Sequence, residues 1–260
     1  MSRAADSGAA VAPTNPSPGG DQVSKGSGFV ASVWREWLKP LLIIGVVMFS
    51  FRSAVADWND VPTGSMKPTI IEGDRIFVNK VAYDLKVPFT TLRLAQWDDP
   101  RWGDVVVLRS PEDRKRLVKR VVGLPGDYLS VQDGYLIRNG VRAEHLTLSQ
   151  EIVDEIAAAE QSAFYFAEEE LGGRGHPIMV RRTDAHARHG IPAIWGPYRV
   201  PDDQYFVMGD NRSHSKDSRV FGTVHRSQIL GEATAVALSF EKRSFWDRRP
   251  RWGRFFSKLQ

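Results

Sequence analysis

Short β-type runs separated by turn residues dominate the chain after Asp57. Seven such runs cover residues 75–80, 104–108, 117–122, 128–131, 135–137, 204–208 and 233–240. Between them lie Gly-Asp and Asn-Gly pairs, which favour tight turns, at 73–74, 103–104, 126–127 and 139–140. Many short strands with few helical patterns are typical of antiparallel sheets. The sequence therefore predicts a mainly β domain built on an antiparallel β-sheet.

One segment departs from the strand pattern. Residues with capping-box spacing begin at Thr147, and isoleucines then recur at helical spacing before two glycines at 172–173. Eight acidic residues and no Lys or Arg lie between 143 and 173. We expect an inserted acidic helical segment at about 142–200 that sits on the β scaffold and takes no part in catalysis.

The N-terminal part of the chain has a different composition. Residues 1–28 are rich in Ala, Ser, Pro and Gly, which leaves little to bury and predicts a disordered tail. An uncharged apolar run follows at 41–51, shorter than the about 20 residues that a membrane-spanning helix needs. It reaches that length if it continues through Arg52 to Ala56. We expect a membrane anchor region over 29–58.

The residues that flank the apolar run bear on its orientation and fate. Arg35 and Lys39 precede it, which places the N-terminus in the cytoplasm and the rest of the chain outside. The basic flank and Ala54-Val55-Ala56 also fit a cleavable signal peptide, although Arg52 and the long preceding tail count against that alternative. Self-cleavage after Ala56 is a further hypothesis.

Composition excludes several chemistries. The chain has no cysteine, so disulfides, cysteine nucleophiles and thiolate metal sites are ruled out. The net charge is +4, and the tail at 241–260, with seven Lys or Arg against two acids, accounts for all of it. This basic aromatic tail either contacts an anionic bilayer or is a flexible solvated segment. We expect no nucleic-acid partner.

Ser65 is a candidate nucleophile because it stands on a Gly-containing turn after a short apolar segment. A serine hydroxyl needs a neighbouring base, yet the six histidines lie in loops or at the margins of the insert. No Gly-x-Ser-x-Gly elbow surrounds it, and Lys67 is one residue too close for a Ser-x-x-Lys motif. His186 and His189 have a spacing that some metal sites use, but no third ligand is near. We expect no metal and no cofactor.

Lys119 is the better candidate for the base. Strand alternation places it on the opposite face from Arg120, whose permanent charge is expected to turn toward water. Lys119 would then point to the apolar side, where burial disfavours the ammonium form. Lowering a lysine pKa from about 10.4 to near 7.5 costs about 4 kcal/mol, within the range of burial alone. The competing interpretation is an ordinary surface lysine whose amine reaches water.

Four motifs, taken together and in order, favour the catalytic interpretation. They are Pro62-Thr63-Gly64-Ser65-Met66-x-Pro68-Thr69, Gly73-Asp74, Lys119-Arg120-x-x-Gly123-Leu124-Pro125-Gly126-Asp127 and the run from Gly209 to Arg219. The series closely resembles bacterial type I signal peptidases, membrane-anchored Ser–Lys endopeptidases that remove signal peptides. The resemblance covers about residues 52–231 and implies a peptidase domain at 59–240.

The resemblance implies a role for each matched residue. Ser65 would be the nucleophile, and Lys119 the general base that later protonates the leaving amine. The Ser65 backbone N–H and the Thr63 hydroxyl would form the oxyanion hole. Ser215 would orient the lysine amine. Three residues would hold the site together by charge pairing: Asp210, Asp217 and Arg219.

We therefore expect an enzyme of the cytoplasmic membrane that cleaves signal-peptide-bearing preproteins on its extracytoplasmic side. The phospholipid bilayer is the second expected partner. A peptidase of the same type dedicated to one secretion or conjugation substrate is the nearest alternative. A catalytically inactive, membrane-anchored β protein that binds extended peptides is an alternative of another class.

Overall fold

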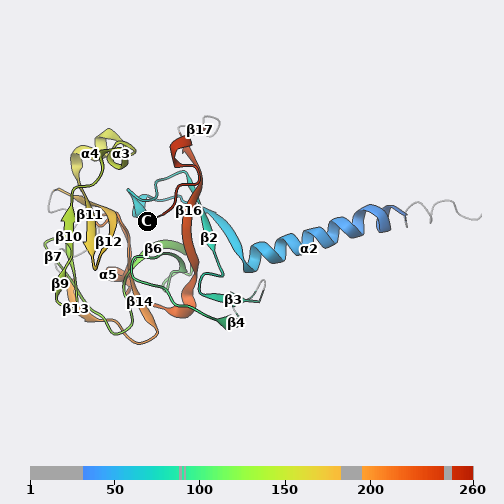
Figure 1. Ribbon diagram of the computed structural model, residues 1–260, viewed down its shortest axis with the longest axis horizontal. Coiled ribbons are helices and arrows are strands. Elements are labelled where there is room, and N and C mark those ends of the chain that lie inside the picture. Colours follow the sequence, from blue (N-terminus) through green and yellow to red (C-terminus); the bar gives the residue numbers. More distant parts are fainter. Residues whose placement is uncertain (1–31, 88–89, 91, 183–194, 243–247, 260) are drawn as a thin grey trace, which may run out of the picture. The chain divides into compact units, whose positions relative to one another are not determined.

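The computed structural model describes residues 32–87, 90, 92–182, 195–242 and 248–259 (Figure 1). The expected disordered tail at 1–28 lies outside the described residues, as do His186 and His189. The chain divides into two compact units, Met1–Val47 and Met48–Gln260.

The expected apolar helix is present with shifted ends. A π-helical turn, η1 (Trp34–Leu38), leads directly into α2 (Lys39–Ala54). Together they form one helix of 21 residues, long enough to cross a membrane, and an 18-residue window within it has a mean hydropathy of 1.4. The helix gains its length at the N-terminal side, because the chain after Ala54 turns into a strand. The expected boundary at 58–59 therefore falls inside β1.

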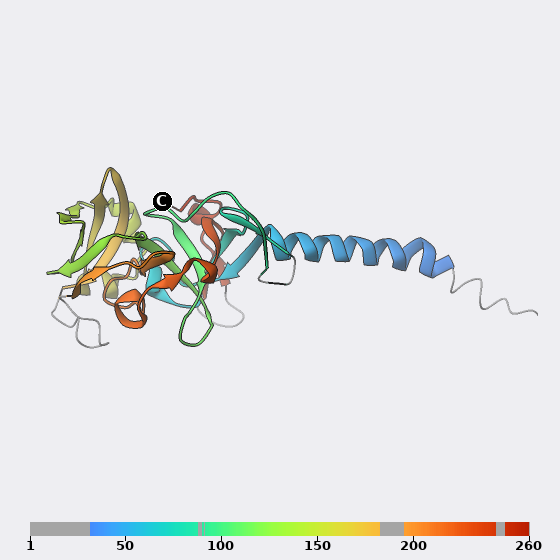
Figure 2. The same ribbon diagram turned by 90° about the horizontal axis from the view of Figure 1, so that it is seen from below.

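The main sheet is antiparallel between all its neighbours and curled, as the two views show (Figure 1 and Figure 2). Its order is β1 (Ala56–Asp60), β2 (Asp74–Asn79), β16 (Ile229–Lys242), β5 (Val105–Arg109), β6 (Arg116–Gly123), β14 (Gln204–Met208) and β15 (Val224–His225). A short strand, β17 (Arg248–Pro250), pairs with β16. The predicted mainly β fold is confirmed.

Smaller sheets complete the larger unit. One joins β7 (Tyr128–Gln132), β8 (Tyr135–Arg138), β9 (Val141–Arg142) and β13 (Trp195–Arg199). A second joins β10 (Glu144–Leu146), β11 (Phe164–Leu171) and β12 (Arg174–Arg181), and a hairpin joins β3 (Asp84–Lys86) to β4 (Arg93–Gln96). Short helices lie between strands at η2 (Gly64–Met66), α5 (Ser218–Phe221) and η4 (Arg226–Gln228), and η5 (Trp252–Arg254) follows the last strand. All seven predicted strand runs are strands.

The insert contains less helix than the sequence predicts. Among its described residues, only α3 (Gln150–Asp154) and α4 (Ala158–Ala163) are helical, and the chain then forms the hairpin β11–β12 (Figure 1). Gly172 and Gly173, at φ of 65° and 79°, form the hairpin turn instead of ending a long helix. A strand is favoured over a helix here because alternate residues from Ala167 to Leu171 are buried, a period that a helix does not have.

Apolar side chains cover both faces of β6. Val118 packs against a cluster made of Val61, Met66, Ile70, Ile76, Val78, Val105, Val107 and Ala233. On the other face, Val121 belongs to a cluster with Tyr83, Val106, Leu108, Tyr205, Val207, Val224 and Ile229. This strand therefore has no solvated face over its C-terminal half, in contrast to the half-buried strand that simple alternation assumes.

The described part of the C-terminal segment, 248–259, packs on the larger unit. Arg254 is 8% exposed, and its Nη2 donates to Asp74 Oδ2 at 2.7 Å. Its Nη1 pairs with Glu155 of the insert. The expectation of a flexible solvated tail is therefore wrong for these residues, because a buried ion pair and β17 hold them. Trp252 and Phe256 remain 73% and 77% exposed, and bilayer contact stays a prediction.

Candidate active site

The candidate nucleophile lies on the short helix η2 between β1 and β2. Met66, 1% exposed, anchors this turn in the core, while the side chain of Ser65 is half-buried. The backbone N–H of Ser65 belongs to the first turn of η2, where N–H groups have no partner within the helix. Such a free donor is suited to an oxyanion.

Lys119 reaches Ser65 from the middle of β6. Its Nζ lies 2.7 Å from Ser65 Oγ, and its side chain is 2% exposed. It shares its face with Val106, its partner on β5, as the expected orientation toward the apolar side requires. Burial lowers the pKa of the Lys119 amine to about 8, although Asp217 and Asp210 oppose that shift. A substantial neutral fraction near neutrality suits a general base.

Arg120 differs from the expectation, because its side chain is 1% exposed and does not face water. Its Nε and Nη2 donate to the two carboxylate oxygens of Asp210, both at 2.8 Å, and its Nη1 donates to Gly103 O at 2.8 Å. A bidentate carboxylate and a carbonyl thus replace the water that the guanidinium loses. The charge stays permanent while the side chain is buried.

The loop at 209–217 brings the expected acids to the site. Asp217 pairs with Arg219 at 2.8 Å and accepts the Gly209 N–H at 3.0 Å. Burial alone would raise the pKa values of Asp210 and Asp217, but the arginine beside each carboxyl lowers them. The expected charge pairing of Asp210, Asp217 and Arg219 is present, although the arginine that pairs with Asp210 is Arg120.

Close backbone approach at Gly209 explains how this loop lies against the nucleophile. A Cβ at this position would lie 2.3 Å from the carbonyl oxygen of Ser65 and 2.3 Å from Ser215 Oγ. Asn211 then fastens the loop to the turn: its N–H donates to Ser65 O at 3.1 Å, and its Nδ2 to Gly64 O at 3.2 Å. Only glycine fits the first position.

Ser215 and Thr63 do not make the contacts expected of them in this structure. Ser215 is 1% exposed, and its Oγ forms no hydrogen bond of normal geometry with any described residue. It lies near enough to the Asp217 carboxylate to help lower that pKa, after Arg219. Thr63 is exposed, and its hydroxyl does not cap η2, which leaves it facing outward beside Ser65. Their roles remain predictions.

Sequence reasoning missed two residues of this arrangement. Arg120 and Asn211 each stand next to a residue that was singled out, within the same motif. No local signal distinguishes them, because the partners of each side chain lie 90 and 147 positions away along the chain. The signal that could have identified them is that both lie inside the sequence motifs.

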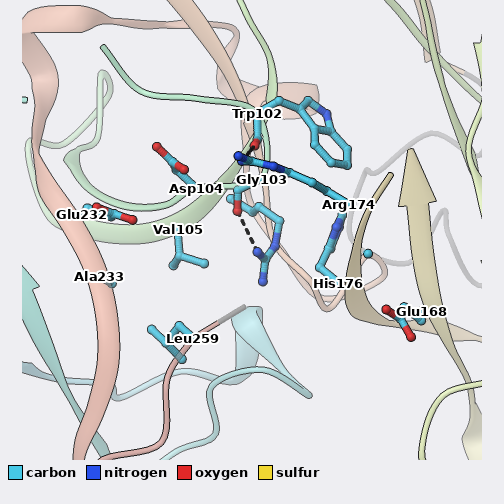
Figure 3. A pocket seen from close by; sticks show the side chains of 12 residues that line it. Trp102, Gly103, Asp104, Val105, Glu168, Arg174, His176, Glu232, Ala233 and Leu259 are labelled. Carbon is cyan, nitrogen blue, oxygen red and sulfur yellow. Dashed lines mark hydrogen bonds between the residues drawn. The ribbon is translucent and has the colours of Figure 1, made fainter. Parts of the chain in front are cut away.

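A polar cavity of about 450 Å³ lies on the Arg120 side of β6 (Figure 3). Its wall includes Trp102, Asp104, Arg174, His176 and Glu232, together with Arg120. Ser65 and Lys119 do not line it. Arg174 Nη1 donates to Trp102 O at 2.9 Å, and Figure 3 shows Asp104 and Glu232 on one side of the cavity and Glu168 on the other. Lys119 and Arg120 therefore face different surroundings.

Comparisons with known proteins identify the family of this chain. The family model described as "Signal peptidase, peptidase S26" matches residues 34–238. Signal peptidase I of Pseudomonas fluorescens is 35% identical over 216 residues, covering 77% of this chain and 70% of its own. Signal peptidase I P of Bacillus subtilis subsp. natto is 33% identical over 209 residues, covering 80% and 90%. A crystal structure of a signal peptidase I from Enterococcus faecalis is 28% identical and covers 53% of this chain and 98% of its own, with a TM-score of 0.31. The chain belongs to the signal peptidase family, peptidase S26, and is a serine endopeptidase.

Proposed function

We propose that this enzyme removes signal peptides from exported preproteins at a membrane surface, with Ser65 and Lys119 as its catalytic dyad. The relatives named above are signal peptidases, which supports the substrate class. The single observation that carries the mechanism is the 2.7 Å separation of Ser65 Oγ from a buried lysine amine. The nucleophile and the base are within hydrogen-bond reach.

Acylation begins with proton transfer. The neutral Lys119 amine takes the Ser65 hydroxyl proton while Oγ attacks the scissile carbonyl carbon. The resulting oxyanion accepts hydrogen bonds from the Ser65 N–H and the Thr63 hydroxyl, each donor contributing about 3 kcal/mol to transition-state stabilisation. The Lys119 ammonium then protonates the leaving amine, and the signal-peptide side stays bound to Oγ as an ester.

Deacylation repeats the same proton transfers with water. Lys119, neutral again, removes a proton from the water that attacks the ester carbonyl. It then returns the proton to Ser65 Oγ as the carboxylate product leaves. With a pKa of about 8, about a tenth of the amine is neutral at pH 7. The ion pairs of Asp210 with Arg120 and of Asp217 with Arg219 limit how far these carboxylates raise the pKa of the amine.

The apolar helix supports action at a membrane. It ends at Ala54, 11 residues before Ser65, so the nucleophile is tethered by a short segment. Arg35 and Lys39 at the N-terminal side favour a cytoplasmic N-terminus and an extracytoplasmic larger unit. The junction of a signal peptide with its mature protein emerges at that surface. An anchored enzyme meets this substrate without diffusing through bulk solvent.

A preprotein cleavage assay with the full chain in proteoliposomes tests this function. Ser65→Ala and Lys119→Ala are each expected to lower the cleavage rate by about 10⁴-fold, because each removes one half of the dyad. Ser162→Ala and Lys115→Ala are matched controls, since both residues are exposed and their side chains contact Ala159 and Asp113, not the dyad; they should retain full activity.

Two outcomes would contradict the proposal. Full activity in either dyad variant would exclude the mechanism. A wild-type chain that binds the preprotein without cutting it would instead indicate a peptide-binding protein that has lost catalysis.

A further inference from the structure

We propose that the insert sheet, β10–β11–β12, is part of the catalytic machinery, and that Glu169 positions the nucleophile through Arg212 and Asn211. The inference rests on the proposed function. It assigns a role to a segment that lies outside the four sequence motifs, and Glu169 itself touches neither Ser65 nor Lys119 in this arrangement. Glu169 is therefore a positioning residue.

Backbone hydrogen bonds join the insert to the loop at 209–217. Met179 of β12 donates its N–H to Asp210 O at 3.0 Å, and Arg212 donates its N–H to Met179 O at 3.0 Å. These bonds form a parallel bridge between Met179 and Asn211. The Arg181 N–H adds a bond to Ser213 Oγ at 2.9 Å. The loop thus lies along the edge of β12 as a short additional strand.

A buried ion pair joins the same two segments through side chains. Arg212 is 4% exposed, and its Nη1 donates to Glu169 Oε1 at 2.7 Å, while its Nη2 pairs with Oε2. Glu169, at the centre of β11, is fully buried. Burial would raise the pKa of Glu169, but Arg212, His145 and His176 hold it well below its usual range. Both partners are therefore charged.

Asn211 links Arg212 to the nucleophile turn through hydrogen bonds. It is the next residue along the chain, and its N–H and Nδ2 bond the carbonyls of Ser65 and Gly64. A shift of Arg212 therefore moves the two carbonyls that set the place of Ser65 Oγ. Displacing a reacting group by about 1 Å costs about 100-fold in rate. Ser65 Oγ lies 2.7 Å from Lys119 Nζ, and a shift of about 1 Å would break this hydrogen bond.

Stability alone does not account for a pair of this kind. Another buried pair, Arg120–Asp210, already holds the loop to the catalytic sheet. Buried ion pairs add little net stability compared with apolar residues of similar volume, but they constrain geometry through their hydrogen bonds. Glu169–Arg212 fixes the part of the loop next to Asn211, whose N–H and Nδ2 bond the carbonyls of the nucleophile turn.

The test replaces the pair with apolar residues in the full-length chain in detergent. The double variant Glu169→Leu/Arg212→Met leaves no charge unpaired, so its thermal midpoint should stay within a few degrees of wild type. We expect kcat to fall about 100-fold while KM changes less than twofold, because peptide binding does not depend on the placement of Oγ. Wild-type kcat in this variant overturns the inference.

A second variant keeps the charge and changes only the geometry. Glu169→Asp retains a carboxylate opposite Arg212 but shortens its reach by one methylene. Positioning predicts a loss of about 10-fold or more in kcat even though the buried charges stay paired. A purely structural role predicts an unchanged kcat here, and that result would also overturn the inference.

Arg226→Met is the matched control. Arg226 is 2% exposed and pairs with Asp84 at 3.0 Å, away from the loop, and Asp84 keeps Lys86 as a partner at 2.6 Å. This variant should keep the wild-type kcat. Failure of the proposed function is distinguishable, because it appears as wild-type chain that does not cleave preprotein; failure of the inference appears as cleavage that is indifferent to Glu169.

Discussion

Lys119 and Arg120 are neighbours on one strand, both at most 2% exposed, and they point to opposite faces of β6. Arg120 meets both oxygens of the Asp210 carboxylate at 2.8 Å, whereas Lys119 meets a neutral hydroxyl at 2.7 Å. Burial costs both cations their water. The arginine charge is permanent, and the Asp210 carboxylate replaces the water that the guanidinium has lost. The lysine can lose its proton, and because its amine meets a hydroxyl and not a carboxylate, burial lowers its pKa to about 8. The type of side chain and the placement of one carboxylate together distinguish these two buried cations.

Placing an arginine at position 119, as at position 120, should have the largest effect on the rate of cleavage. Lys119→Arg keeps a cation beside Ser65 but removes the ability to lose a proton near neutral pH. We expect the rate of preprotein cleavage to fall about 10⁴-fold, as far as in Lys119→Ala. Activity above a hundredth of wild type would show that positive charge, not a neutral amine, is what the site needs.

Removing the paired cation should damage the fold instead. Arg120→Met leaves the fully buried Asp210 carboxylate without its ion-pair partner, which costs about 3–5 kcal/mol of unfolding free energy. Urea unfolding of the full chain in detergent measures this loss. Combining it with Asp210→Leu should recover most of it, since no charge then remains unpaired. A single variant within about 1 kcal/mol of wild type would contradict the pairing.

Removing Lys119, whose amine has no carboxylate within contact among the described residues, should stabilise the fold instead of destabilising it. Lys119→Met is expected to raise the unfolding free energy at pH 7 by about 3 kcal/mol, because a depressed lysine pKa of about 8 against 10.5 measures the burial penalty. Below pH 8 the wild-type amine is charged in both states. Between pH 8 and 10.5 the unfolded state binds more protons, so wild type gains stability and the advantage of the variant shrinks. A stability difference between Lys119→Met and wild type that increased with pH would contradict a lowered pKa for Lys119.

The pH profile of catalysis should show the smallest effect for a single step, here one pH unit. Only the neutral amine accepts the Ser65 proton, so kcat/KM should rise about tenfold per pH unit and level off above an inflection near 8. Initial rates of preprotein cleavage between pH 5 and 10 measure the inflection. An optimum well below neutrality would identify another base.

The strands were predictable because they depend on local patterns. Gly-Asp and Asn-Gly turns bound β2, β5 and β7–β8, and alternation within each run is independent of distant contacts. The insert was not predictable in the same way. The expected capping box at Thr147 does not form, since α3 begins after Ser149 without a side-chain cap. The strand β11 exists because residues 164–171 pair with 174–181, and pairing leaves a weak local signal.

The residues of the candidate site also differ in how far the sequence predicted them. Ser65, Lys119 and the acids of the loop were expected, since their residue types and order mark them. Arg120 was assigned to solvent, because alternation on a half-buried strand was assumed where both faces are covered. Arg212 and Glu169 were missed because they are 43 positions apart and belong to different segments.

The sequence by itself determined the main strands of the scaffold, the lack of thiol chemistry and the choice of Ser65 and Lys119 as candidate nucleophile and base. Only the tertiary structure decided how each buried cation is compensated and which segments lie against the candidate nucleophile. The reason is physical: strand alternation and turn chemistry act between neighbours in the chain, whereas a pKa and a hydrogen-bond network depend on groups that are neighbours only in space.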